Sequence, residues 1–363
     1  MKRLAMLGMA LGLGVLAQGL PVITGLNGPM GLLFAPDGRL YVVEYGLGGD
    51  TQVEMVNPET GERVAVRVGQ TSRVLRLEPE GSVVEVARFP SVAFAQESSG
   101  ASRLAWLGGL LATSGGWNIP EREPMPLMAV VARVGPGGPE KLADLWAFEK
   151  ARNPDGHLLD SHPYGLTVAA DGYVYVADAG ANALLKVNPT TGAVSVVAVF
   201  AGLPAPFANP ARKGAMEMDP VPTAVVAKNG VFYVSLLSGA PFPHGAAKVV
   251  KVEGGQVSDY ATGATMLTDL QEGPDGQLYA VRMAETGERG PIPATGAVLR
   301  VRPGGFEEVV GGLPFPTALA ITPSGDLYVT VNGVGAPGSG AVWKFPGASP
   351  QSTRLGFLRH PLL

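Results

Sequence analysis

The sequence predicts an all-β protein, a six-bladed β-propeller of four-stranded antiparallel blades, and three observations support this fold class. The chain of 363 residues contains 51 glycines and 32 prolines, a composition that suits many short strands joined by turns. A strand–turn–strand unit recurs along the chain, and so does a third strand with one basic residue between apolar neighbours. Repetition of one such unit is typical of propeller blades.

The strand–turn–strand unit is clearest at residues 29–43, where two apolar stretches flank the turn Asp37-Gly38. Asp-Gly and Asn-Gly pairs favour tight hairpins because both turn positions tolerate a positive φ. Further copies are expected at residues 163–177 and 222–235, around Asp275-Gly276, around Gly325-Asp326, and in a degenerate form at residues 102–113.

The third strand of each unit is marked by a basic residue that we expect to point into water rather than to form an anion site. A fourth, outer strand is expected soon after it in four of the copies, at residues 83–87, 194–199, 256–260 and 306–310. The six basic residues are Arg76, Arg133, Lys186, Lys251, Arg300 and Lys344.

The two ends of the chain are expected to share the last blade. Residues 21–29 parallel residues 309–316, which end a fourth strand and lead into the next blade, whereas the last unit stops after its third strand. Residues 22–24 should therefore pair with residues 342–345 and leave no free sheet edge.

Insertions between the second and third strands are expected at residues 46–71, 115–126, 239–245 and 285–295. Such loops lie on one face of a propeller. A connector at residues 142–162 joins the second and third blades, and it is expected to contain a short helix at residues 142–151.

The first residues read as a signal peptide. Lys2 and Arg3 precede an apolar stretch that is too short to span a bilayer, and cleavage is expected after Ala17. The predicted domains are the signal peptide at residues 1–17, the propeller at 18–346 and a tail packed on it at 347–363. We thus expect a secreted or periplasmic protein without a membrane anchor.

Charge and cysteine content restrict the partners. The formal net charge is −4 and no basic cluster follows the start, so nucleic acid is not an expected partner. The chain has no cysteine, so its stability must come from packing rather than from disulfides. A monomer that binds a small molecule, an extracellular protein or a polysaccharide is expected.

The hairpins resemble those of NHL-repeat and gluconolactonase-type propellers, and residues 176–182 are similar to the NHL signature. A closer resemblance is to the ScyD/ScyE-like family of secreted bacterial propellers, although His162 stands where that family's pattern has Asn. This resemblance implies an exported propeller and no settled activity. Its motifs are the connector residues 153–166, Pro222-Thr223, residues 241–245 and Gly48-Gly49-Asp50.

Polar residues that precede the inner strands are expected to ring one mouth of the central channel. The resemblance to gluconolactonase-type enzymes implies a divalent metal on the propeller axis, but their Glu-Gly-Pro and Asn-Gly-Leu motifs are missing. The ring should favour a cation or a hydroxyl-rich neutral molecule over an anion. Its members, as candidate ligand-binding residues, are Asn27, Glu97, Asp160, His162, Asp219 and Asp269.

A second candidate site lies in the connector. Asn153, Asp155 and Asp160 offer oxygen ligands within a short stretch, which suits Ca²⁺ or another divalent cation. The alternative is an Asn-Pro-Asp-Gly turn followed by an aspartate that caps the next strand.

No catalytic motif accompanies these sites. The sequence has neither a nucleophile elbow nor a phosphate-binding loop. The first functional hypothesis is a ligand- or protein-binding scaffold without catalysis. The alternatives are a metal-dependent lactonase or hydrolase of gluconolactonase type and, third, a protein similar to quinoprotein sugar dehydrogenases.

Overall fold

The structure is a computed structural model that describes residues 19–56, 62–94 and 97–347. The predicted signal peptide and all of the predicted tail except Gly347 lie outside these ranges. No helix in the described residues is long and apolar enough to cross a membrane.

Six antiparallel sheets of four or more strands make up most of the described residues. Each begins with one of the predicted hairpins, whose turn glycines adopt positive φ angles as expected, Gly38 at 78° and Gly172 at 77° among them. The inner strands of the six sheets are β2 (Pro29–Phe34), β8 (Ala101–Trp106), β12 (Pro163–Val168), β18 (Pro222–Lys228), β22 (Leu267–Glu272) and β28 (Leu319–Ile321).

The other strands follow in the order that the repeats predict. The second strands are β3 (Leu40–Glu44), β9 (Leu110–Ser114), β13 (Val174–Asp178), β19 (Val231–Leu236), β23 (Leu278–Arg282) and β29 (Leu327–Val331). The third strands are β5 (Arg63–Leu77), β10 (Val130–Gly135), β14 (Ala183–Val187), β20 (Ala247–Glu253), β26 (Gly296–Arg302) and β30 (Gly340–Phe345). The outer strands are β6 (Val83–Phe94), β11 (Gly138–Asp144), β15 (Val194–Val199), β21 (Gln256–Ala264), β27 (Gly305–Leu313) and β1 (Leu20–Leu26).

The sheets are arranged in a closed ring. Each inner strand contacts the inner strand of the next sheet, from β2 through β8, β12, β18 and β22 to β28, which contacts β2 again. Apolar cores lie between neighbouring sheets, and the last of them packs Ile23 and Val342 against Leu32 and Val42. This arrangement confirms the all-β propeller class.

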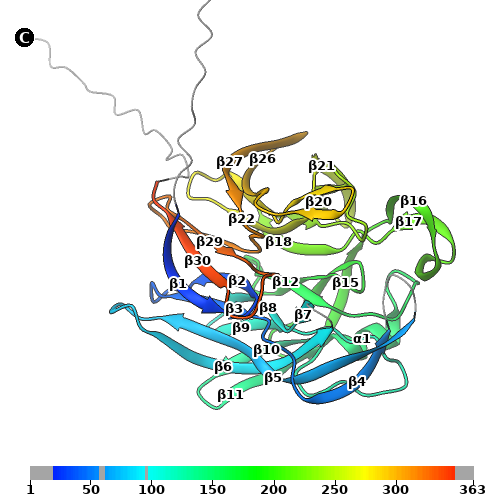
Figure 1. The fold of residues 1–363 in the computed structure, drawn as a ribbon. Coiled ribbons are helices and arrows are strands. Elements are labelled where there is room, and N and C mark those ends of the chain that lie inside the picture. Colours follow the sequence, from blue (N-terminus) through cyan, green and yellow to red (C-terminus); the bar gives the residue numbers. More distant parts are fainter. Residues whose placement is uncertain (1–18, 57–61, 95–96, 348–363) are drawn as a thin grey trace, which may run out of the picture.

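The closing pair joins the two ends of the described chain. Strand β1 pairs antiparallel with β30, with Ile23 opposite Val342 and Thr24 opposite Ala341, and the two strands lie side by side in blue and red in Figure 1. The predicted pairing of residues 22–24 with residues 342–345 is confirmed. The last sheet consequently has no unpaired outer edge at β30.

Additional strands extend the first sheet, and another pair forms a small sheet of its own. Strand β4 (Thr51–Val56) pairs with the long β5, β7 (Glu97–Ser99) pairs with β6, and β24 (Glu285–Gly287) pairs with β25 (Gly290–Ile292). The hairpin of β16 (Leu203–Asn209) and β17 (Ala215–Met218), with the 3-10 helix η1 (Pro210–Arg212) between them, was not predicted.

The predicted connector helix begins later than expected. Residues 142–144 belong to β11, and helix α1 (Leu145–Arg152) starts after Asp144, whose carboxylate accepts a hydrogen bond of 2.9 Å from the Ala147 amide. Asp144 is therefore the N-cap that sets the start of the helix.

Candidate functional site

One face of the ring gathers the residues before the inner strands and the loops that follow the second strands. This arises from the antiparallel order, because the start of strand one and the end of strand two lie at the same end of a sheet. A large cavity on this face is lined from both kinds of segment and from strands β5 to β7.

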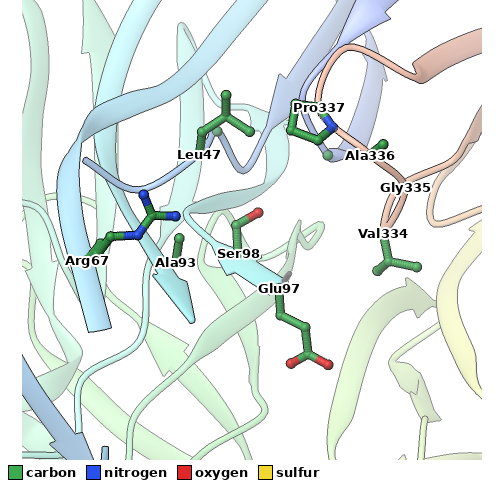
Figure 2. Close-up of a pocket in the computed structure, with 12 residues that line it drawn as sticks. Leu47, Arg67, Ala93, Glu97, Ser98, Val334, Gly335, Ala336 and Pro337 are labelled. Carbon is green, nitrogen blue, oxygen red and sulfur yellow. The ribbon is translucent and has the colours of Figure 1, made fainter. Parts of the chain in front are cut away.

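The cavity has a volume of about 670 Å³, which is within the range of small-molecule sites. In Figure 2, Arg67 and Ala93 lie on one side and Val334, Gly335 and Ala336 on the other, with Glu97 and Ser98 between them. The remaining lining residues are Gly28, Gly46, Leu47, Gly333 and Pro337.

The cavity combines two charges of opposite sign with uncovered apolar side chains. Within the described ranges, neither Arg67 nor Glu97 takes part in an ion pair or a side-chain hydrogen bond, so both are free to bind a ligand. Leu47 and Val334 are 43% and 50% exposed, which is high for side chains of this kind. A ligand that offers both hydroxyl groups and an apolar face would satisfy all four.

His162 lies at the start of β12, near the strand that carries Glu97. Its Nε2 is 3.3 Å from the Ser99 hydroxyl, and its ring centroid is 6.0 Å from that of Tyr164. Burial lowers the pKa of His162 to about 4, so the imidazole is neutral at pH 7. A neutral ring of such low basicity is a weak general base, although it can share a hydrogen bond with the Ser99 hydroxyl, as donor or acceptor.

A small acidic hollow lies on the same face, at the third and fourth blades. It has a volume of about 10 Å³, near the space of a single water molecule or ion. Its lining comes from the connector, from the loop between β13 and β14, and from the insertion before β18. The lining residues are Asp155, His157, Leu158, Asp160, Gly180, Asn182, Ala211 and Asp219.

The carboxylates of this hollow are held in different ways. Asp155 accepts 2.9 Å and 2.8 Å hydrogen bonds from the His157 amide and the Asn182 side chain, and Asp219 accepts from Arg212 and Asn182. Asp160 has no side-chain hydrogen bond within the described part of the chain. Burial, together with neighbouring aspartates, raises the pKa of Asp160 to about 8.

Two further acidic side chains interact with residues that line the hollow. Asp178 is fully buried and accepts hydrogen bonds from the Ser161 hydroxyl and the His162 amide, both at 2.7 Å. Burial outweighs these bonds and raises the pKa of Asp178 to about 6. Glu149 of α1 is 1% exposed, and burial followed by the charges of nearby aspartates raises its pKa to about 9.

The other predicted residues serve the fold in this structure. The Asn27 side-chain oxygen accepts a 2.9 Å hydrogen bond from the Gly338 amide, and the backbone N–H of Asn27 donates to the Glu44 carboxylate. Asn153 closes its turn, since its side chain accepts from the Gly156 amide and donates to the His157 carbonyl. Asn153 is absent from the lining of the hollow, so the structure brings together only Asp155 and Asp160 of that predicted set.

Asp269 lies inside an inner strand rather than before one. Strand β22 begins at Leu267, three residues earlier than the sequence suggests, and this register buries Asp269 to 1% exposure. Its carboxylate is 3.4 Å from Nε of Arg103 and accepts a 2.8 Å hydrogen bond from the Leu319 amide. Asp269 therefore joins inner strands and does not reach the channel mouth.

Arg103 lies among the inner strands. Its guanidinium donates to the carbonyl oxygens of Met30, Thr268 and Thr317, and it lies 4.8 Å from the ring centroid of Tyr164. These contacts reach four other blades from β8. A fixed cation at this position disfavours a second, divalent cation beside it.

The residues present do not fit the axial metal that the gluconolactonase resemblance implies. Asp269 is already paired with Arg103, while Asp160 and Asp219 belong to the off-axis hollow. Within the described ranges, no three His, Cys, Asp or Glu side chains already have the spacing of metal ligands.

Sequence reasoning missed Arg67, Arg103 and the loop at residues 333–337. Arg103 did leave a signal, because it occupies the inner-strand position that holds Gly31 and Gly165 in other copies of the hairpin. Arg67 lies in an insertion without repeat partners, so no internal comparison could single it out.

No protein-family model matches this chain, and no curated protein matches its sequence significantly. Solved structures match its fold at low identity. A putative oxidoreductase (glucose dehydrogenase) from Thermus thermophilus has a TM-score of 0.51 at 16% identity, over 90% of this chain and 99% of that one. The PQQ-bound aldose sugar dehydrogenase from Streptomyces coelicolor has a TM-score of 0.51 at 13% identity, over 90% and 98%.

A putative gluconolactonase has a TM-score of 0.50 at 15% identity, over 90% of this chain and 91% of that one. At such identities the likeness concerns the fold. Fold and site together define the chain as a β-propeller with a ligand-sized cavity on the face that carries its insertions.

Proposed function

We propose that this protein is an exported, monomeric, ScyD/ScyE-like propeller that binds a neutral, hydroxyl-rich molecule without transforming it. The ligand is a small sugar or a segment of a polysaccharide. Export is supported by the signal-peptide pattern of residues 1–17, and the ScyD/ScyE relation by the motifs of the connector.

The observation that carries the binding proposal is the cavity of about 670 Å³ with unpaired Glu97 and Arg67. A carboxylate accepts hydrogen bonds from hydroxyl groups and a guanidinium donates to their oxygens, so a polyol can satisfy both. The exposed Leu47 and Val334 suit the apolar face of a sugar ring. Glu97 would repel a simple anion in this cavity, and Arg67 would repel a simple cation.

Isothermal titration with glucose, cellobiose and glucono-δ-lactone tests this proposal. We expect at least one of them to bind, and we expect Glu97→Gln and Arg67→Gln each to weaken binding by roughly tenfold or more, because each removes a charge-assisted hydrogen bond. Glu253→Gln, an exposed change away from the cavity, is the control and should bind like the wild type.

Two kinds of result would contradict the proposal. Binding of none of the three, or unchanged binding by both cavity variants, removes the cavity as a hydroxyl-binding site. Hydrolysis of glucono-δ-lactone with repeated turnover, or reduction of a dye by glucose after addition of pyrroloquinoline quinone, would replace the binding function with one of the two enzymatic alternatives.

A further inference from the structure

We propose that Asn27 is a positioning residue of the ligand-sized cavity, and that it holds the wall loop, residues 333–338, in the shape that binds the ligand. This inference rests on the proposed binding function, because it concerns the same cavity. Asn27 does not line the cavity, whereas its neighbour Gly28 and residues 333–337 of the wall loop do. Its effect on the ligand is therefore indirect, through the backbone of the loop.

The wall loop forms one side of the cavity, opposite Arg67 and Ala93 in Figure 2. It contributes Val334, an apolar contact that is 50% exposed. Three of its six residues are glycines, and glycine loses more conformational freedom on ordering than any other residue. A loop of this composition needs fixed contacts to keep one shape.

The glycines themselves are required by the fold. A Cβ at position 333 would lie 2.3 Å from the Thr317 side chain, and Gly338 adopts a φ of 72°. Gly333 thus lets the loop approach the segment before β28 closely, and Gly338 allows a left-handed turn of the backbone. Stiffness must come from hydrogen bonds to neighbouring segments instead.

The two limbs of the wall loop are held by different segments. On the first limb, the amides of Asn332 and Gly333 donate to carbonyl oxygens of the segment before β28, at 2.7 Å and 3.1 Å. On the second limb, the Gly338 amide donates a 2.9 Å hydrogen bond to the side-chain oxygen of Asn27. Of the hydrogen bonds that the structure describes for residues 334–338, this is the one that reaches another segment of the chain.

Asn27 is suited to hold the loop because its own backbone is fixed on both sides. Its N–H donates to the Glu44 carboxylate at 2.8 Å, and its carbonyl oxygen accepts a 3.0 Å hydrogen bond from the Gly46 amide. Glu44 is fully buried, and its other carboxylate oxygen accepts a 2.6 Å hydrogen bond from Nε of Arg73. The Asn27 side chain therefore extends from a rigid backbone that directs its oxygen at the loop.

The hydrogen bond between Asn27 and Gly338 links closure of the ring to the shape of the cavity. Asn27 directly follows the closing strand β1, and the wall loop connects β29 with β30 of the same sheet. A wall that is ordered before the ligand arrives does not have to be ordered on binding, which favours affinity. The closing strand thus contributes to binding without contacting the ligand.

Hydrogen exchange and isothermal titration of the full mature chain with Asn27→Ala test the proposal. Because the Gly338 amide loses its acceptor, we expect amide exchange in residues 333–338 to become roughly tenfold faster. The ligand is whichever of glucose, cellobiose and glucono-δ-lactone binds the wild type. We expect its Kd to rise roughly three- to tenfold, because a hydrogen bond that orders the wall is lost.

A conservative variant and a matched control accompany this change. Asn27→Asp keeps an acceptor oxygen at the same position, so it should restore slow exchange and bind within about twofold of the wild type. Asn188→Ala is the control, because the Asn188 side chain also accepts a backbone hydrogen bond, 2.8 Å from the Thr190 amide. It lies in the turn between β14 and β15, at the opposite end of a sheet from the cavity, and should change neither measurement.

The two measurements separate failure of this inference from failure of the binding function. Unchanged exchange of the wall loop in Asn27→Ala, an unchanged Kd, or an Asn27→Asp variant as impaired as Asn27→Ala would each overturn the role of Asn27 while the cavity still binds. If the wild type binds none of the three compounds, the binding function fails. Exchange alone then decides the role of Asn27: faster exchange supports its hold on the loop, and unchanged exchange overturns it.

Discussion

His162 shows that the surroundings of a residue can give it a chemistry different from the one its type suggests. It lies beside Ser99 and Tyr164, and burial lowers its pKa to about 4. The unfolded chain binds a proton at this residue near pH 6.5, whereas the folded chain binds it only near pH 4. Between these two values the unfolded state holds more protons, so the contribution of His162 to stability falls as the pH is lowered.

We therefore expect His162→Gln to reduce the loss of stability on acidification. Because His162 keeps some exposure, the wild type should lose about 1–2 kcal/mol more than the variant between pH 7.5 and pH 4.5. Urea unfolding of both proteins at the two pH values measures this difference. If the wild type and the variant lost the same amount of stability, the pKa of His162 would be the same in the folded and unfolded states.

The prediction of site residues depended on where each strand begins. Glu97 was chosen because it was expected just before an inner strand; in the structure it lies in β7, ahead of β8, and lines the cavity. Asp269 was chosen by the same rule, but β22 begins three residues earlier than expected and the residue is buried. An error of three residues in a boundary is enough to move a side chain from a channel mouth into the core. Asp155 and Asp160 were predicted because they are close in the sequence, whereas Asn182 and Asp219 join them only through the fold.

Individual elements were predicted well wherever the repeat constrained them. A turn aspartate, a tyrosine on the second strand and a basic residue on the third recur together, as in Asp171, Tyr175 and Lys186. The Tyr175 hydroxyl donates to Asp171 at 2.8 Å, and the Lys186 amine lies 2.9 Å from the same carboxylate. These side chains were expected to point into water, and Lys186 does lie on the outside of its blade, where it is 30% exposed and also pairs with the turn aspartate. The hairpin of β16 and β17 has no counterpart in other blades, so no periodicity revealed it.

The role of β1 in closing the last blade can be tested by substitution, because one face of the strand is buried and the other faces solvent. Ile23 is 4% exposed and packs against Leu32 and Val342, whereas the next residue, Thr24, faces solvent. A charged side chain at position 23 would either be buried away from water, which costs free energy, or force β1 to separate from β30. We expect Ile23→Asp to lower the free energy of unfolding by about 3 kcal/mol or more and to promote aggregation through the exposed edge of β30.

Thr24→Asp is the matched control and should change the free energy of unfolding by about 0.5 kcal/mol or less. Urea denaturation and light scattering of both variants report stability and association. Similar behaviour of the two variants would show that β1 does not close the last blade in solution.

At the scale of the whole molecule, the ring depends on contacts between blades that share no hydrogen-bonded strands. Six apolar cores supply most of them, one between each pair of neighbouring sheets. Arg103 adds a polar contact that reaches across the channel to carbonyl groups near the start of β2, β22 and β28. Its role could not be read from one blade alone, since its partners come from residues as far away in the chain as Thr317.

Arg103→Met tests this connection. The change would leave Asp269 as a buried charge without its partner and three carbonyl oxygens without their donor, and such losses cost about 3–5 kcal/mol. We expect that decrease in the free energy of unfolding by urea denaturation. Arg133→Met, on the exposed third strand of the same blade, should stay within about 0.5 kcal/mol of the wild type. Adding Asp269→Asn to Arg103→Met should recover part of the loss, because the double variant no longer buries an unpaired carboxylate. If Arg103→Met is as stable as Arg133→Met, the guanidinium does not hold the inner strands together.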